Sequence, residues 1–261
     1  MLRPPYVYRW AGLLAVVGLF VGVTAVVLLD EGPATALAAG PVIAVPSVTA
    51  VDAAAPVAAP PRVDPTLLSA ARAHGKVVSL TFDDGPDGRY TPQILRLLAQ
   101  NHATATFCQI GGQARSQPAL VRRVVAAGHR LCNHTITHDE GLGTHTPRVM
   151  DQQLRVSRDV LAAAAGGADV DYFRAPGGNW TPTMLRLSAQ NGMQPLGWTV
   201  DTRDWTRPGS AAIVATVKRQ VHPGAIILFH DGGGPRDQTV SAVAQLLPWL
   251  RAQGYSFVFP T

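Results

Sequence analysis

Two adjacent carboxylates, Asp83 and Asp84, stand in the motif TFDDGP at residues 81–86. Neighbouring negative charges are costly to hold together unless a cation or an arginine neutralises one of them. A metal ion is the natural partner for such a pair. Aspartate and Gly-Pro are also common turn residues, so the motif by itself is equally compatible with a tight turn.

Two histidines four residues apart, His134 and His138, form the motif HTITH. On a helical turn, residues at this spacing lie on one face, and the two imidazoles converge. Two imidazoles and one carboxylate supply three protein ligands and leave a position open for water, which is typical of catalytic metal sites. The chain has eight histidines, so a pair at this spacing also arises by chance.

Three further motifs combine charged and small residues. In FRAPGG at residues 173–178, Arg174 can clamp a carboxylate, and the glycines leave backbone N–H groups uncovered, as an oxyanion site requires. DTRDW at residues 201–205 and LFHDGGG at residues 228–234 add aspartates and His230. A histidine beside a buried aspartate keeps one tautomer and exchanges a proton near neutral pH. Each motif alone also fits a surface loop or ordinary core packing.

The elements that must position these residues alternate between short β-rich runs and longer helical patterns. Strands are expected at 77–82, 103–108, 130–132, 171–174, 194–199, 225–229 and 255–259, and helices at 91–98, 118–127, 147–165, 181–190, 210–221 and 240–251. Such alternation indicates an α/β fold with right-handed crossovers and a parallel sheet. A closed or nearly closed barrel is favoured, in which functional residues lie at the C-terminal ends of strands. All five motifs fall at such ends.

In sequence and in order, the motifs TFDDGP, HTITH, RAPGG, DTRDW and LFH resemble those of the polysaccharide deacetylases with a NodB-type domain, carbohydrate esterase family 4. The resemblance covers roughly residues 74–261. It implies a deformed (β/α)7-type barrel that hydrolyses acetyl groups from a carbohydrate polymer. N-acetylglucosamine units of peptidoglycan come first and chitin oligosaccharides second. An O-acetyl xylan esterase and a non-catalytic carbohydrate-binding barrel are the alternatives.

The resemblance also implies a metal centre and an acid–base pair. A divalent metal ion, zinc in the first place with cobalt as an alternative, would be held by Asp84, His134 and His138. Asp83 would be the general base, oriented by Arg174. His230 would be the general acid, tuned by Asp204.

The same resemblance assigns the substrate pocket. Trp205 and Leu228 would line the acetyl pocket, and the Gly177 N–H would help to hold the oxyanion. Two positions depart from the family's motifs. Gly177 stands where several relatives have a tyrosine, which weakens the inference of a sugar-contacting side chain there but not that of the backbone donor. Thr202 conservatively replaces a common serine.

The N-terminal residues 11–29 contain no charged side chain and follow Arg3 and Arg9. A helix of this length spans about 28 Å, close to the thickness of a hydrocarbon core, and the preceding basic residues predict a cytoplasmic N-terminus. Residues 1–30 are therefore expected to be a signal anchor. An A-x-A sequence at 36–38 leaves open a cleaved signal peptide. The catalytic domain would be extracellular at the cell membrane, or secreted after cleavage.

Composition divides the rest of the chain. Residues 31–71 are rich in Ala and Pro and are expected to be an extended linker, and residues 72–261 form the domain. With 47% hydrophobic and 15% charged residues, the chain can bury a core. The net charge of +5 suits anionic surroundings, but the absence of a run of five Lys or Arg residues argues against nucleic acid as a partner.

Two cysteines, Cys108 and Cys132, end the second and third expected strands, which should be neighbours in a parallel barrel. Disulfides persist outside the cell, so a bridge is compatible with an exported domain. Two buried thiols are equally compatible with the sequence.

Overall fold

The computed structural model describes residues 63–72 and 74–261. The expected signal anchor and most of the expected linker lie outside these residues. None of the helices within the described part is long and apolar enough to cross a membrane.

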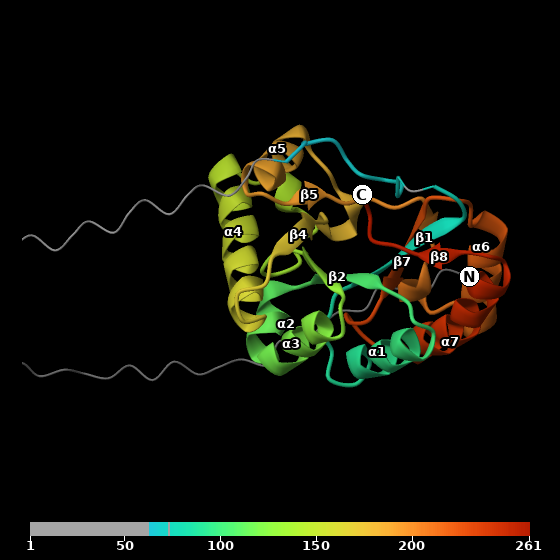
Figure 1. Ribbon diagram of the computed structural model, residues 1–261. Coiled ribbons are helices and arrows are strands. Elements are labelled where there is room, and N and C mark those ends of the chain that lie inside the picture. The colour runs from blue at the N-terminus through green and yellow to red at the C-terminus, as the bar shows by residue number, and fades with distance from the viewer. Residues whose placement is uncertain (1–62, 73) are drawn as a thin grey trace, which may run out of the picture. The chain divides into compact units, whose positions relative to one another are not determined.

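A parallel sheet forms the centre of the described chain (Figure 1). Its strands follow the order β5-β4-β3-β2-β1-β7-β6, and β8 pairs with β1. They are β1 (Val77–Asp83), β2 (Ala105–Gln109), β3 (Arg130–Asn133), β4 (Val170–Phe173), β5 (Gln194–Pro195), β6 (Val200–Asp201), β7 (Ala225–His230) and β8 (Ser256–Phe257). The parallel α/β fold expected from the sequence is therefore present.

The helices lie around the outside of this sheet (Figure 1). They are α1 (Thr91–Gln100), α2 (Gly111–Ser116), α3 (Pro118–Ala126), α4 (Pro147–Ala164), α5 (Pro182–Gln190), α6 (Ser210–Gln220) and α7 (Asp237–Ala252). Short 3-10 turns are η1 (Leu142–Thr144), η2 (Pro176–Gly178) and η3 (Asp204–Thr206). Thr146 and Thr181 cap α4 and α5 by accepting from the backbone N–H of Val149 and Met184, which explains where these helices begin.

The alternation of side chains along each strand separates two faces. On the outer face, Phe82 of β1 stacks with Phe107 and Phe229, at ring-centroid distances of 5.3 and 5.5 Å, and packs under the helices. The inner, concave face carries a smaller buried cluster formed by Cys108, Cys132, Tyr172, Leu196 and Ile226. Asp83 and His230, which are directly paired across β1 and β7, end the strands above this cluster.

The concave face also holds a disulfide between Cys108 and Cys132. The two residues are directly opposite in the pairing of β2 with β3, and their Cα atoms are 4.1 Å apart. Of the two states that the sequence leaves open, the structure has the bridged one.

The sheet is open along one seam, between its two end strands β5 and β6. Only the first two residues of the expected strand at 194–199 form a strand, β5, while β6 begins just after it at Val200, and β5 and β6 do not pair within the described residues. Leu68 forms a bridge with Leu196 and Ala70 forms one with Ala225, so residues ahead of the expected boundary at 72 lie across the seam. Local sequence could not indicate this, because residues 66–71 find their hydrogen-bond partners far along the chain.

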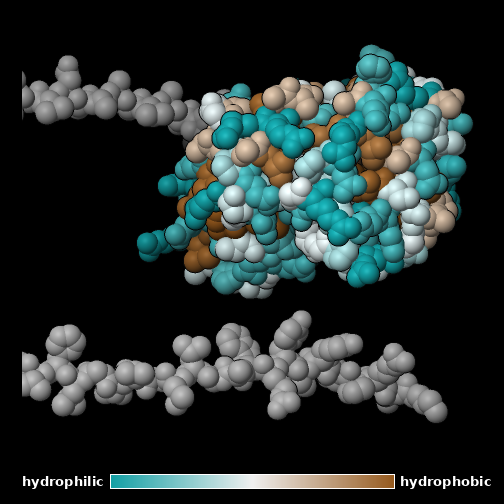
Figure 2. Space-filling view, turned by 90° about the horizontal axis from the view of Figure 1, so that it is seen from below, coloured by the Kyte–Doolittle hydropathy of each residue, from teal (hydrophilic) through white to brown (hydrophobic). Residues whose placement is uncertain are grey.

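Hydrophilic residues predominate on the face shown in Figure 2, and hydrophobic ones gather there in separate groups. The large apolar side chains are instead collected between the sheet and its helices. Among the described residues only Val149 and Trp205 are exposed large hydrophobics, and Trp205, with half of its surface exposed, belongs to the cleft described next.

Candidate active site

The five motifs meet in one cleft of about 590 Å³ at the C-terminal ends of the strands. The residues lining it are Asp83, Asp84, Ile110, His134, His138, Glu140, Gly177, Gly178, Asn179, Trp198, Asp201, Trp205, Leu228, His230, Gly233 and Arg236. Of the site residues named from the sequence, only Arg174 and Asp204 are absent from this lining. Both are buried directly behind it and contact residues of the cleft.

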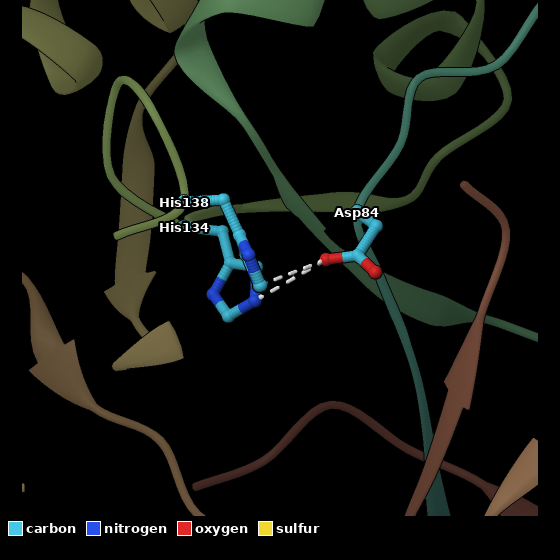
Figure 3. A group of neighbouring side chains, drawn as sticks. All are labelled: Asp84, His134 and His138. Atoms are coloured by element: carbon cyan, nitrogen blue, oxygen red, sulfur yellow. Dashed lines mark ion pairs between the residues drawn. The ribbon is translucent and has the colours of Figure 1, made fainter. Parts of the chain in front are cut away.

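Asp84, His134 and His138 point toward one another (Figure 3). One carboxylate oxygen and one ring nitrogen of each histidine lie within 4.8 Å of each other. Asp84 Oδ1 is 3.6 Å from His134 Nε2 and 3.2 Å from His138 Nε2. Asp84 Oδ1 is buried and has no hydrogen-bond partner, so a cation between these atoms would satisfy it. We call these three residues, which could hold a metal ion, the metal group.

The two histidines converge in a way that the sequence did not indicate. Residues 134–138 form a loop rather than a helical turn. Thr135 and His138 have φ values of 65° and 57°, in the left-handed region, and they fold the loop so that the rings approach to a centroid distance of 4.9 Å. Asn133 Oδ1 accepts from the Thr135 N–H, and Thr135 Oγ1 accepts from the His138 N–H. The expected helical turn is therefore wrong, although the expected convergence is correct.

The surroundings of His134 suit a metal ligand. Its Nδ1 lies 2.8 Å from the carbonyl oxygen of Arg174, so it donates there as the protonated nitrogen and leaves Nε2 facing Asp84. Burial lowers the pKa of His134, more than the nearby Asp83 and Asp84 raise it. A neutral imidazole with a fixed tautomer is the form that binds a metal ion.

Asp83 is held by a buried arginine. Arg174 has no exposed surface, and its Nη1 donates to Asp83 Oδ1 at 2.7 Å and lies 2.9 Å from Thr81 Oγ1. Asp83 Oδ2, the other oxygen, is 3.7 Å from His134 Nε2. One carboxylate oxygen is thereby fixed, and the other lies beside the metal group.

His230 and Asp204 form a second buried pair. Asp204 Oδ1 accepts from His230 Nδ1 at 2.7 Å, and Asp204 Oδ2 accepts from the His230 N–H and from Thr239 Oγ1. Burial lowers the pKa of His230, but the hydrogen bond and charge of Asp204, with Asp83 and Asp84, outweigh it and leave the pKa raised. Burial raises the pKa of Asp204, but its hydrogen bonds, chiefly that from His230, leave it lowered.

Two glycines of the cleft have geometric reasons to be glycine. Gly177 has a φ of 61°, in the left-handed region, and Glu140 and Asn179 fill the space that a side chain would need. Gly233 has a φ of 71°, and a Cβ there would collide with the Asp84 carboxylate. The loop after β7 thus packs its backbone directly against a member of the metal group.

Sequence reasoning missed several residues that line or support the cleft. Trp198, Glu140, Asn179 and Arg236 are part of its wall, but they lie in irregular segments without a pattern. Thr239 supports Asp204 from α7, and its place on the buried face of that helix, among apolar residues, was the signal that could have revealed it.

The fold, the three residues that could hold a metal ion and the two buried pairs, Arg174 with Asp83 and His230 with Asp204, have the form of a hydrolase site. The sequence profile described as Polysaccharide deacetylase matches residues 70–196. The chain is 43% identical over 188 residues to a chitooligosaccharide deacetylase from Sinorhizobium fredii, covering 68% of this chain and 87% of that one. It is 39% identical to a peptidoglycan-N-acetylglucosamine deacetylase from Bacillus cereus, covering 70% and 85%. The chain therefore belongs to the polysaccharide deacetylase family and is a hydrolase of that family.

One similar solved structure bears on whether membership of this family implies activity. The fold resembles that of a carbohydrate esterase family 4 pseudoenzyme from Bacillus anthracis with a TM-score of 0.69 and 28% identity, covering 75% of this chain and 67% of that one. The fold alone therefore does not establish activity, which depends on the residues in the cleft. Asp83, Asp84, His134, His138 and His230 are all present here and are assembled in one cleft.

Proposed function

We propose that this protein removes the N-acetyl group from N-acetylglucosamine units of a polymer, either peptidoglycan or a chitin oligosaccharide. The observation that carries the proposal is the assembly of Asp83 and His230 on paired strands beside the metal group. The Sinorhizobium fredii and Bacillus cereus relatives bear names for these two substrates. An amide needs both activation of water and protonation of the leaving nitrogen, and the cleft holds a candidate for each.

A divalent metal ion fits the group formed by Asp84, His134 and His138, and zinc suits this set of one carboxylate and two imidazoles. When bound, such an ion supplies Lewis-acid polarisation of a carbonyl and activation of water.

In the proposed reaction, Asp83 Oδ2 accepts a proton from the attacking water, since Oδ1 is already held by Arg174. The water oxygen forms a bond with the acetyl carbon, and the Gly177 N–H donates to the developing oxyanion. His230 Nε2 then gives its proton to the sugar nitrogen as the C–N bond breaks. The products are acetate and the free amino sugar, and Asp204 keeps His230 in the tautomer that this step needs.

Acetate release by the purified protein tests the function. Chitin oligosaccharides, peptidoglycan and acetylated xylan are compared, each with added zinc and with a chelator. Metal-dependent release from either amino-sugar polymer is the expected result. Release from xylan alone would make the protein an O-acetyl esterase, and release from none would support a non-catalytic carbohydrate-binding barrel.

Replacing Asp83 by Asn tests the proposed base. Turnover should fall by about 10²–10⁴-fold, which is the usual contribution of a general base. Zinc binding should persist, because Asp84, His134 and His138 remain. The matched control is Asp169→Asn, which makes the same chemical change at an exposed position just before β4, at the opposite end of the strands. An Asp83→Asn protein with the native rate would rule out Asp83 as the base.

A further inference from the structure

Residues 66–71, which we call the strap, cross the seam, bridging Leu196 just after β5 on one side and Ala225 of β7 on the other (Figure 1, cyan segment). The strap lies parallel to Leu196 at Leu68 and antiparallel to Ala225 at Ala70. Its Thr66 carbonyl also accepts from the Gln194 side chain at 2.7 Å. The strap thus occupies the place where a strand would pair if the barrel were closed.

Hydrogen bonds connect the strap to the guanidinium group of Arg174. The Leu68 N–H donates to the Pro195 carbonyl at 2.9 Å, and the Leu68 carbonyl accepts from the Gly197 N–H at 2.8 Å. The Gly197 carbonyl, on the same short segment, accepts from Arg174 Nη2 at 2.8 Å. Arg174 Nε donates to the neighbouring Leu196 carbonyl at 3.1 Å. Segment 195–197 is therefore held by the strap and itself holds the guanidinium.

The remaining nitrogen of Arg174 is the one that contacts Asp83. Since Arg174 is fully buried, it has no water to replace a lost acceptor, and its orientation depends on these carbonyls. A displacement of segment 195–197 would therefore move the guanidinium and the Asp83 carboxylate with it. Shifts of about 1 Å in reacting groups can cost about 10²-fold in rate.

The Leu68 side chain adds a packing contact. It packs against the concave-face cluster that includes Leu196, Ile226 and the bridged Cys108 and Cys132. The strap is thus fixed to segment 195–197 by its backbone and to the interior of the barrel by this side chain.

We propose that the strap orients Arg174, and that Leu68 is a positioning residue for Asp83. The inference rests on the proposed function, because it takes Asp83 as the base. It places residues outside the five motifs, and ahead of the expected domain boundary, among those that set the rate of the reaction.

Leu68→Ala in the full chain tests this role. The expected result is a fall in kcat of about tenfold, with an unchanged KM and unchanged zinc affinity, because neither the cleft wall nor the metal group is altered. The matched control is Leu97→Ala, which shortens an equally half-buried leucine on α1, away from the cleft, and should leave kcat unchanged. Leu68→Met, which keeps the volume, should restore the rate.

A second variant tests the contact between the strap and segment 195–197 without creating a cavity. In Gly197→Ala the added Cβ would lie 3.0 Å from Ser69 Oγ and 3.3 Å from Leu67 Cγ, so it should push the strap outward. It should lower kcat in the same way. If both Leu68→Ala and Gly197→Ala fold and keep the native kcat, the proposal is wrong.

A double-mutant cycle separates positioning from general destabilisation. In an Arg174→Lys background the guanidinium contacts are gone, so Leu68→Ala should cause little further loss of kcat. An equal loss in both backgrounds would overturn the proposal. If the native chain itself releases no acetate, the proposed function fails instead, and the two failures are distinguishable.

Discussion

The buried carboxylates around the cleft differ in what surrounds them, and this difference separates their chemistry. Asp204 accepts hydrogen bonds from His230 and Thr239 and is stabilised as an anion. Asp83 has one oxygen held by Arg174 and one beside the metal group. Asp231 is buried with one oxygen unpaired and is stabilised in its neutral form. The same side chain is therefore biased toward its charged form at Asp204 and toward its neutral form at Asp231.

Asp204→Asn should move the alkaline limb of the pH profile. Asp204 raises the pKa of His230, and a general acid works only while it is protonated. Removing the carboxylate charge lowers that pKa, so kcat/KM should begin to fall at a pH lower by about 1–3 units. The control is Thr239→Val, which removes one hydrogen bond but keeps the charge and should shift the limb less. An unmoved limb in Asp204→Asn would exclude His230 as the titrating acid.

Asp231→Asn should change how stability depends on pH. Burial raises the pKa of Asp231 from 3.8 to about 7. Between about pH 4 and pH 7, the folded state therefore keeps a proton that the unfolded state has lost. The stability that this proton contributes is complete below about pH 4 and is lost as the pH rises through 7. In the metal-free protein the loss reaches at most about 1.4 kcal/mol per pH unit.

Denaturant unfolding in chelator at pH 5 and pH 7.5 measures this effect. The native protein should lose more free energy of unfolding between the two pH values than Asp231→Asn loses. Equal losses would show that Asp231 is charged in the folded state. The asparagine can still receive the hydrogen bond that Thr91 donates, so a fold-breaking effect is not expected.

At the scale of elements, the periodicity of apolar residues was sufficient to predict where an element lies if one of its faces is covered by the rest of the protein. Helices α4 and α5 were expected within two residues of their observed limits, because each has a threonine cap, an early proline and a regular apolar face. Strand β1 was equally clear because all of its residues are buried. The early end of the expected strand 194–199 after Pro195, and the start of β6 at Val200, were not predictable, since a run of mixed residues gives no sign of where pairing partners change.

The candidate site shows the same limit. The types of residue in the five motifs were enough to predict a metal group, a base and an acid, and parallel strands bring their C-terminal ends together. The loop that joins His134 to His138 depends on a left-handed backbone conformation at Thr135. The presence of a threonine in a sequence does not predict that conformation. The wall formed by Trp198 and Asn179 comes from irregular segments, which carry no periodicity.

The disulfide between β2 and β3 should contribute measurably to stability. It closes a loop with a sequence separation of 24, for which the chain-entropy estimate is about 3.5 kcal/mol. Replacing Cys108 and Cys132 together by alanine should lower the free energy of unfolding by about that amount. Unfolding of the native protein with and without reductant is the comparison, and no difference would contradict the bridge.

At the scale of the whole molecule, residues 1–30 are proposed to place the domain outside the cell. The full chain should sediment with membranes and leave them only with detergent, because the uncharged run at 11–29 is long enough to span a bilayer. The control is a chain in which two leucines of this run are replaced by lysine. Recovery of a shorter, soluble protein from the medium would instead indicate cleavage near 36–38.

The strap makes contacts with parts of the chain that are synthesised much later. During synthesis Leu68 leaves the ribosome before every strand of the sheet, yet it pairs with Leu196 and packs near Ile226, which are made much later. Contacts between such distant parts of a chain form slowly, because a long loop must close first. A chain that ends before β7 would hold all three members of the metal group but neither His230 nor a complete seam. If such a chain bound metal, the metal content of a preparation would not measure how much of it carries the complete site.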